Sequence, residues 1–404
     1  MNQVLKVTLR SGKDEAVRRF HPWVFSGAIK KMEGPAFDGC RTEVFSNKGE
    51  YLACGIYQDA SIAVRLLAFA PERPEGFSPA FWLEKLQAAW QLRRQCGLTH
   101  SKTSNIYRLV HGEGDHLPGL IIDHYDGHLV IQIHATGLYG YIDQIAEGLR
   151  ALYGQGLKSI YDKSRETLPE PFWKDNTSRG FIHPAGDLPA GGGVVGAMEN
   201  NLRFMIDIPG GQKTGFFIDQ RENRMLLSHY APGKKILNAF AYSGAFSVYA
   251  LRAGAREVHS LDSSLRATQL CQQNATINRL EEKHRIINSD AMDYLRSCTE
   301  AYDLMILDPP AYAKHQRVKH KAVQGYKRLN LQALKVIAPQ SLLFTFSCSQ
   351  VIDLNLFKST ITSAAILSGR KVRILHQLSQ GPDHPTSIFH PEGHYLKGLV
   401  LHVD

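Results

Sequence analysis

The second half of the chain alternates between short apolar runs and longer amphipathic stretches. From residue 215 onward, runs of strand length are separated by stretches of roughly ten or more residues with helical spacing. This alternation is typical of a parallel sheet covered by helices on both faces. The runs predicted as strands are Lys235–Phe240, Glu257–Asp262, Arg285–Asp290, Tyr302–Asp308 and Ser341–Ser347.

The N-terminal residues have a different pattern, with short strands joined by tight turns. Val44–Phe45 and Tyr51–Tyr57 flank the turn Ser46–Gly49, whose Asn and Gly tolerate positive φ, and Ser61–Leu67 follows. Short strands of this kind favour a small barrel or sandwich. The run Pro71–Gly76 is predicted to be a linker or a long surface loop.

The middle of the chain mixes helices and strands. Ser78 and Pro79 are suited to the first turn of a helix that continues to about Cys96. The Asp-Gly pair at 126–127 predicts a hairpin between two apolar runs. A Pro- and Gly-rich stretch at 183–193 then marks a boundary. We therefore predict three domains: a β-rich domain at 1–72, an α+β domain at 73–187 and an α/β domain at 188–404.

Composition excludes several classes of protein. With 43% hydrophobic and 21% charged residues, the 404-residue chain is expected to be globular. Its apolar runs are shorter than the ~20 residues that a membrane span needs, and its N-terminus does not resemble a secretory signal, so we expect a cytoplasmic protein with no membrane partner. The six cysteines form no CxxC pair, which argues against a zinc ribbon or a cysteine-ligated iron–sulfur cluster, and no metal is expected. Their scatter favours a reducing compartment.

The net charge of +9 favours a polyanionic partner such as a nucleic acid. Residues 311–328 contain no acidic side chain, so this segment is predicted to contact phosphates, although a solvated helix face would look the same. The predicted RNA-binding residues are Lys314, Arg317, Lys319, Lys321, Lys327 and Arg328.

Ligands bind at the carboxyl ends of the strands in parallel sheets of this kind. Residues that follow the first three predicted strands are therefore candidates for ligand binding. A turn of small residues with the single glycine Gly244 opens the first helix, and it lacks the GxGxxG pattern of nicotinamide enzymes. Asp262 lies eighteen residues later, which suits a ribose, although it could instead cap a helix. Asp290 could accept from the adenine amine or cap the next helix.

The fourth and fifth strand ends suggest chemistry. Asp308 is followed by Pro309 and Pro310, which make a stiff loop, and Tyr312 is available to stack on a planar substrate. A proline turn with no role in ligand binding would have the same sequence. Cys348 follows the last apolar residue of the fifth strand. A thiol at this edge is a candidate nucleophile, whereas most single cysteines are small buried hydrophobes.

Taken in order, these motifs resemble the class I S-adenosylmethionine-dependent RNA methyltransferases, and most closely the RlmI (YccW) family of 23S rRNA cytosine-5 methyltransferases. The resemblance covers nearly the whole chain and implies an N-terminal PUA domain that binds RNA, a central α+β (EEHEE-like) domain and a Rossmann-like methyltransferase domain. The motifs that carry it are His21–Phe25, His111–Asp115, Leu117–Leu120, Lys213–Arg221, Asp308–Pro310, Phe346–Ser349, Asp383–Pro385 and Tyr395–Gly398.

The resemblance also implies the roles of individual residues. Cys348 would be the nucleophile, and Asp308 would lie beside the transferring methyl group of S-adenosylmethionine, which becomes S-adenosylhomocysteine. The implied cofactor-binding residues are Phe217, Asp219, Gln220, Arg221, Ala241, Tyr242, Ser243, Gly244, Asp262, Ser263, Asp290, Ala291, Asp308 and Pro309. The chain departs from the family at Ser243–Ala245, where two adjacent glycines are common, and at Ala311 and Tyr312, where Lys and Phe are common.

The implied reaction is methylation of a cytosine C5 through a covalent bond between Cys348 and C6. The expected partner is 23S rRNA or a large-subunit assembly intermediate. The base that removes the C5 proton is not identified, because residues 309–312 contain no second cysteine. Two alternatives stay open, namely methylation of an exocyclic purine amine and a non-catalytic RNA-binding factor for ribosome assembly. A homodimer is also left open.

Overall fold

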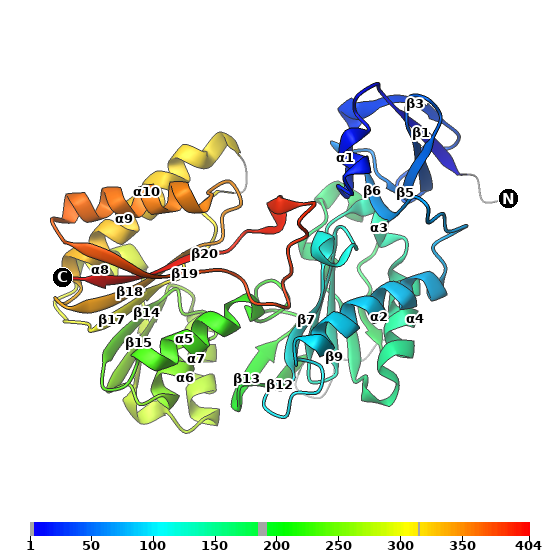
Figure 1. Ribbon diagram of the computed structural model, residues 1–404. Coiled ribbons are helices and arrows are strands. Elements are labelled where there is room, and N and C mark those ends of the chain that lie inside the picture. The colour runs from blue at the N-terminus through cyan, green and yellow to red at the C-terminus, as the bar shows by residue number, and fades with distance from the viewer. Residues whose placement is uncertain (1–3, 185–191, 314–315) are drawn as a thin grey trace. The chain divides into compact units, whose positions relative to one another are not determined.

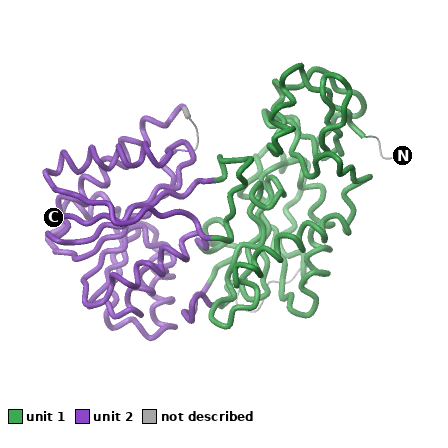
Figure 2. Tube along the Cα trace, in the orientation of Figure 1, with its two compact units in different colours: residues 1–197, 206–216, 382–393 green, residues 198–205, 217–381, 394–404 purple. Residues whose placement is uncertain are grey.

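The computed structural model describes residues 4–184, 192–313 and 316–404. The chain forms two compact units (Figure 2). The first unit comprises residues 1–197, 206–216 and 382–393, and the second comprises residues 198–205, 217–381 and 394–404. The expected boundary after residue 187 lies outside the described residues, and the division into three domains stays a prediction.

The N-terminal part of the first unit is a six-stranded sheet with the order β2-β6-β5-β4-β1-β3. Its strands and short helix are β1 (Leu5–Leu9), α1 (Glu15–Arg18), β2 (Trp23–Phe25), β3 (Ile29–Glu33), β4 (Arg41–Phe45), β5 (Tyr51–Tyr57) and β6 (Ile62–Phe69). Gly49 has a φ of +84° in the turn between β4 and β5, which is the backbone conformation that the sequence predicted there. Leu5, Val7, Val44 and Val64 are fully buried in the core of this part.

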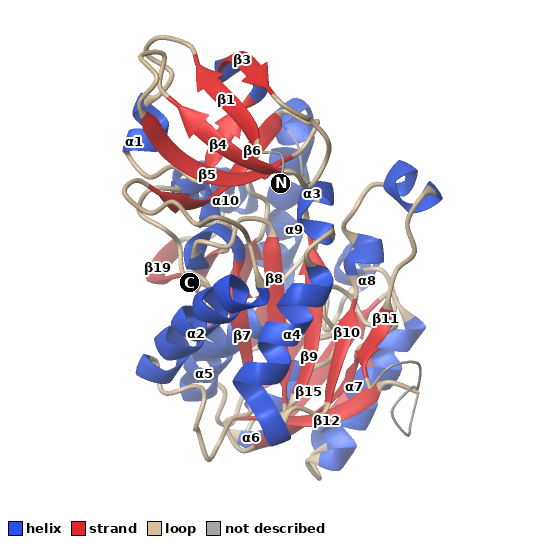
Figure 3. Ribbon diagram, turned by 90° about the vertical axis from the view of Figure 1, so that its right-hand side faces the viewer, coloured by secondary structure: helices blue, strands red, loops and turns tan. Residues whose placement is uncertain are grey.

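The rest of the first unit is built on a sheet with the order β11-β10-β9-β8-β7. Figure 3 shows α2 and α4 lying on one face of this sheet. Ser78 caps α2 by accepting a hydrogen bond from the Phe81 N–H at 3.4 Å, as the sequence predicted. The elements are α2 (Pro79–Gln95), β7 (Ile106–His111), β8 (Leu120–Tyr125), β9 (His128–Ile133), α3 (Thr136–Tyr139), α4 (Ile142–Tyr153), β10 (Ser159–Asp162) and β11 (Gly180–His183).

A two-stranded hairpin, β12 (Val194–Glu199) and β13 (Leu202–Asp207), follows. Its turn residues Asn200 and Asn201 have φ values of +50° and +62°. Two consecutive left-handed residues make the turn type whose twist matches paired strands, and asparagine is among the few residues that tolerate it.

The second unit is a seven-stranded sheet with the order β16-β15-β14-β17-β18-β20-β19. The five strands β14 to β18 are mutually parallel, whereas β20 runs antiparallel to both of its neighbours. The strands are β14 (Lys235–Ala239), β15 (Glu257–Asp262), β16 (His284–Asn288), β17 (Leu304–Leu307), β18 (Ser341–Ser347), β19 (Val372–Leu378) and β20 (Lys397–Val403). The sequence predicted all five parallel strands to within about two residues and missed β19 and β20.

Helices cover both faces of this sheet, with α5, α6 and α7 on one face and α8, α9 and α10 on the other (Figure 1). The helices are α5 (Arg221–Tyr230), α6 (Ala245–Arg252), α7 (Leu265–Ile277), α8 (Ala291–Ser297), α9 (Lys319–Val336) and α10 (Leu354–Ser368). Ile236 packs in one core cluster and the next residue, Leu237, packs in the other. Adjacent residues of a strand face opposite ways, which is why these strands are apolar throughout.

None of the helices in the described ranges combines the length and the hydropathy that crossing a bilayer requires.

Candidate active site

The carboxyl ends of the parallel strands meet at one edge of the sheet in the second unit. Ala239 of β14 is in register with Leu261 of β15 and with Leu307 of β17. Because these residues lie side by side, the segments that follow them leave the sheet next to one another. The structure therefore brings together the turn after β14, Asp262, Asp308 and Cys348, as the sequence predicted.

The turn between β14 and α6 has an unusual backbone. Phe240 and Tyr242 have φ values of +61° and +48°, and Gly244 has +70°. A Cβ on Gly244 would lie 3.1 Å from the Cα and the Sγ of Cys271, so only glycine lets α7 approach the turn this closely. Left-handed non-glycine residues cost free energy and gather at ligand-binding sites.

Asp262 fixes this turn from the neighbouring strand. Its Oδ2 accepts a hydrogen bond from the Tyr242 N–H at 3.0 Å, and its Oδ1 accepts one from the Ser264 N–H at 2.9 Å. Ser264, rather than Asp262, caps α7. Asp290 differs, because its Oδ1 caps α8 by accepting from the N–H groups of Met292 and Asp293. The capping alternative thus applies to Asp290 and not to Asp262.

Asp308 is a half-buried carboxyl group at the end of β17. Its Oδ2 accepts a hydrogen bond from Gln220 Nε2 at 3.0 Å, and Gln220 is oriented in turn by Asn223, whose Nδ2 donates to Gln220 Oε1 at 2.6 Å. Burial, together with the nearby charge of Asp219, raises the pKa of Asp308 to about 7. Both protonation states of this group are therefore populated near neutral pH.

One carboxylate oxygen of Asp219 accepts no hydrogen bond from any residue that the structure describes. It lies in the single turn η6 (Ile218–Gln220), and its Oδ2 accepts a hydrogen bond from the Tyr395 hydroxyl at 2.6 Å. Its Oδ1 is buried and has no hydrogen-bond partner within the described ranges. A buried carboxylate oxygen of this kind is expected to have a donor or a cation as its ligand.

Cys348 follows β18 and lies against the loop that begins at Asp308. Its Sγ is 3.9 Å from the carbonyl oxygen of Pro309. Burial and the charges of Asp308 and Asp219 raise the pKa of the thiol to about 12, so the unliganded protein carries a neutral thiol here. The next residue, Ser349, anchors the loop, because its Oγ accepts from the Ala313 N–H at 3.3 Å.

Several residues that hold the site in place had no assigned role in the sequence. Buried Glu199 accepts from Arg224 Nε and Nη2 at 2.9 and 2.8 Å, and Arg224 Nη1 donates to the Phe217 carbonyl at 2.9 Å, beside η6. Lys397 donates from Nζ to the carbonyl oxygens of Ser349 and Tyr395 at 2.7 and 2.5 Å, and burial lowers its pKa to about 8. A buried Glu at a hairpin turn gives no local signal of such a contact.

The basic segment lies on η8 (Gln316–Val318) and the first half of α9. Arg317, Lys321 and Arg328 are exposed, whereas Lys319 and Lys327 are half-buried. Among the residues that the structure describes, no carboxylate comes within ion-pair distance of these five. Lys314 lies outside the described residues. Lys321 and Arg328 are seven residues apart in α9 and therefore lie near one face of that helix, whereas Arg317 precedes it in η8.

Tyr312, the aromatic residue that follows Pro309 and Pro310, packs against α9. The Tyr312 ring lies 4.6 Å from that of Tyr326, centroid to centroid. A Cβ on Gly325 would lie 2.8 Å from the Tyr312 ring, so the glycine lets this ring pack against α9.

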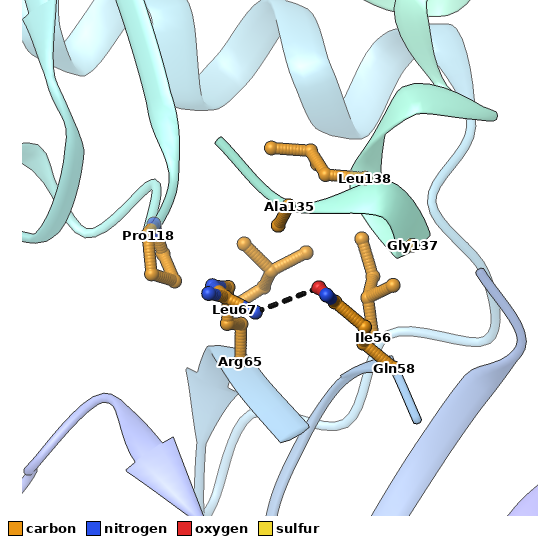
Figure 4. A pocket seen from close by; sticks show the side chains of 8 residues that line it. All are labelled: Ile56, Gln58, Arg65, Leu67, Pro118, Ala135, Gly137 and Leu138. Carbon is orange, nitrogen blue, oxygen red and sulfur yellow. Dashed lines mark hydrogen bonds between the residues drawn. The ribbon is translucent and has the colours of Figure 1, made fainter. Parts of the chain in front are cut away.

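A small cavity in the first unit contains none of the predicted site residues (Figure 4). Its volume is about 10 Å³, enough for about one water molecule. Arg65 points into it and donates from Nη1 to Gln58 Oε1 at 2.9 Å. The cavity is lined by Ile56, Gln58, Arg65, Leu67, Pro118, Ala135, Gly137 and Leu138.

The raised pKa of Asp308 predicts a pH-dependent stability. Between about pH 4 and pH 7 the folded chain keeps this proton while the unfolded chain loses it, so stability falls as the pH rises through that window. Relative to Asp308→Asn, which cannot ionise, wild type should lose about 2 kcal/mol between pH 5 and pH 8 in urea unfolding. The exposed-site control Asp293→Asn keeps Asp308 and should therefore lose as much stability as wild type over this pH range. Parallel stability curves for wild type and Asp308→Asn would contradict the assignment.

Comparisons with known proteins agree with this architecture. A PUA-like domain model matches residues 7–69, and an S-adenosylmethionine-dependent methyltransferase model matches residues 193–386. A Streptococcus mutans protein described as a SAM-dependent methyltransferase is 22% identical, with a TM-score of 0.81 over 98% of this chain and 99% of its own. Another methyltransferase structure, in complex with SAH, has a TM-score of 0.82 at 22% identity over 99% of both chains. The predicted fold class and the predicted cofactor, S-adenosylmethionine, are confirmed.

Curated relatives match over almost the full length. The ribosomal RNA large subunit methyltransferase I of Aeromonas salmonicida is 37% identical over an alignment of 404 positions, and the alignment covers 98% of each chain. The protein of the same name from Cronobacter sakazakii is 34% identical over an alignment of 404 positions, which covers 99% of each chain. The chain therefore belongs to the ribosomal RNA large subunit methyltransferase I family.

Proposed function

We propose that this protein transfers a methyl group from S-adenosylmethionine to C5 of a cytosine in large-subunit ribosomal RNA, with Cys348 as the nucleophile. The relatives' name supports the RNA substrate, and the PUA-like match supports RNA binding. The observation that carries the choice of atom is the position of Cys348. Its sulfur lies 3.9 Å from the Pro309 carbonyl oxygen, at the edge of the sheet where we place the cofactor.

The residues at this edge fit the cofactor. Asp219 Oδ1 is a buried, unused acceptor, which suits the ammonium of the methionine part. Asp262 lies at the end of β15, where a carboxylate can accept from ribose hydroxyls. The Asp290 cap uses only Oδ1, so Oδ2 is left to accept from the adenine amine. Backbone groups of 217–221 and 241–244 would surround the methionine part.

The same residues suit a cationic ligand. Asp219 and Asp308 lie close enough for the charge of one to raise the pKa of the other. When bound, S-adenosylmethionine supplies a methyl group on a positively charged sulfur. A positive charge at this site would lower the pKa of Asp308 and the pKa of the Cys348 thiol.

The proposed chemistry begins at the Cys348 thiol. The ionised form of Asp308 accepts the thiol proton and then delivers it to N3 of the cytosine, while the sulfur forms a bond to C6. C5 becomes electron-rich and takes the methyl group. Loss of the C5 proton to a base restores the C5–C6 double bond and releases the sulfur of Cys348 as a thiolate, to which Asp308 returns the proton from N3. A pKa near 7 suits Asp308 to both accepting and donating a proton.

Methylation of an exocyclic purine amine is the main alternative, and it needs no thiol. The Tyr312 ring, which could have held a planar amine, packs against Tyr326 and Gly325. A non-catalytic RNA-binding role would need no cofactor contacts at all. Replacement of Cys348 separates these alternatives.

Cys348→Ala should abolish methyl transfer to large-subunit rRNA while leaving binding of S-adenosylmethionine within about twofold of wild type, because the thiol touches the base and not the cofactor. Transfer is measured as isotope incorporated into RNA, and cofactor binding by calorimetry. Cys298→Ala, which removes another half-buried thiol of the same unit, is the matched control and should stay active. Normal transfer by Cys348→Ala would exclude the covalent route.

Asp262→Ala should weaken cofactor binding by about 10- to 100-fold, because it removes two acceptors from the ribose and frees the Tyr242 N–H. RNA affinity, measured by filter binding, should be nearly unchanged. Glu282→Ala, an exposed carboxylate at the opposite edge of the sheet, should bind the cofactor normally. An equal loss of both affinities in Asp262→Ala would indicate misfolding instead.

The exposed residues Arg317, Lys321 and Arg328 should contact phosphates. Replacing all three by Gln should weaken RNA binding and lower the slope of log K against log salt by about 2 to 3. The same charge change at Lys283, Arg285 and Arg296, which are exposed elsewhere on this unit, is the control. Equal salt slopes for the two triple variants would show that the segment is only a solvated helix face.

A further inference from the structure

A cluster of metal-ligating side chains lies in the first unit and has no part in the proposed reaction. His21 lies between α1 and β2, whereas His390 and Glu392 lie in the segment 382–393, at the turn η9 (Pro391–Gly393). One ligand atom of each of the three side chains lies within 4.8 Å of the other two.

His390 is the residue that points to a ligand. It is only 3% exposed, and neither of its ring nitrogens has a hydrogen-bond partner within the described ranges. Glu392 Oε2 lies 3.7 Å from its Nε2, which is too far for a hydrogen bond. Two buried ring nitrogens without a partner are costly, and an ion that binds one of them would offset part of that cost.

The surroundings of His21 suit a metal ligand as well. Its Nδ1 lies 3.4 Å from the Trp23 carbonyl oxygen and 3.2 Å from the Trp23 backbone nitrogen. Because the Trp23 N–H donates to Nδ1, the ring proton is on Nε2 in the unliganded protein; coordination through Nε2 would move that proton to Nδ1, where the Trp23 carbonyl oxygen can accept it. A ligating histidine is usually oriented in this way, by a backbone carbonyl on its other nitrogen.

The two parts of the cluster are held firmly. The Trp23 ring packs on His390 with 4.3 Å between centroids, and Trp23 Nε1 donates to Glu113 Oε1 at 2.9 Å. The segment 382–393 is anchored at its start, because Asp383 Oδ2 accepts from the Arg108 N–H at 3.0 Å. A pre-formed pair of imidazoles next to carboxylates gives a site with the charge that a divalent cation needs.

We propose that His21, His390 and Glu392 bind one divalent transition-metal cation, with zinc the cation that suits this donor set best. Two imidazoles and one carboxylate match zinc in ligand type, and a water molecule would complete the tetrahedral shell. Magnesium and calcium prefer sites made of oxygen ligands only, so they should not compete. Binding would fasten residues 390–392 to the start of β2.

The test is a titration of the full-length, chelator-treated protein with zinc chloride, followed by calorimetry. We expect one equivalent to bind, and cobalt chloride to give the visible absorption bands of a four-coordinate site. His390→Ala and His21→Ala should each weaken zinc binding by at least about 100-fold, whereas the exposed control His394→Ala should bind normally.

His390→Cys, which keeps a zinc ligand at this position, should restore binding and separates loss of a ligand from misfolding. Absence of zinc binding by the wild type, or equal binding by wild type, His390→Ala and His21→Ala, would overturn the proposal. Methyl transfer is not the readout, so the outcome does not depend on the proposed reaction.

Discussion

Two half-buried carboxyl groups, those of Asp308 and Asp219, set the electrostatics of the candidate site in the second unit. Burial and the charge of Asp219 raise the pKa of Asp308 to about 7. The charges of Asp308 and Asp219 also help to raise the pKa of the Cys348 thiol. Without a ligand, this arrangement disfavours ionisation of Asp308 and Cys348. A cationic ligand reverses that effect, which is why the site is suited to a sulfonium cofactor.

Much of the surrounding structure keeps these groups in place. Gln220 and Tyr395 each donate a hydrogen bond to one of the carboxyls, and Asn223 orients Gln220. Arg224, which is paired with buried Glu199, donates a hydrogen bond to the carbonyl oxygen of Phe217, the residue that precedes η6. Removing one partner of a buried ion pair leaves an uncompensated charge, so this support acts as a unit.

The sequence predicted the parts of the site that depend on chain direction. A residue at the carboxyl end of a parallel strand must lie at the ligand edge, so Asp262, Asp308 and Cys348 could be located from apolar runs alone. Asp290 was ambiguous because capping and ligand binding use the same residue type. Contacts such as Tyr395 with Asp219, or Glu199 with Arg224, join residues far apart in the chain and leave no local pattern. Strand β20 was missed for the same reason, since its pairing with β18 is decided by the fold.

The identity of the methylated nucleoside tests the central claim most directly. Wild-type protein, S-adenosylmethionine with an isotopically labelled methyl group and unmodified large-subunit rRNA would be incubated together, and the RNA would then be digested to nucleosides for mass spectrometry. The account predicts that the label appears in 5-methylcytidine. Label in a methylated purine, or no label in RNA from a protein that binds the cofactor, would contradict it.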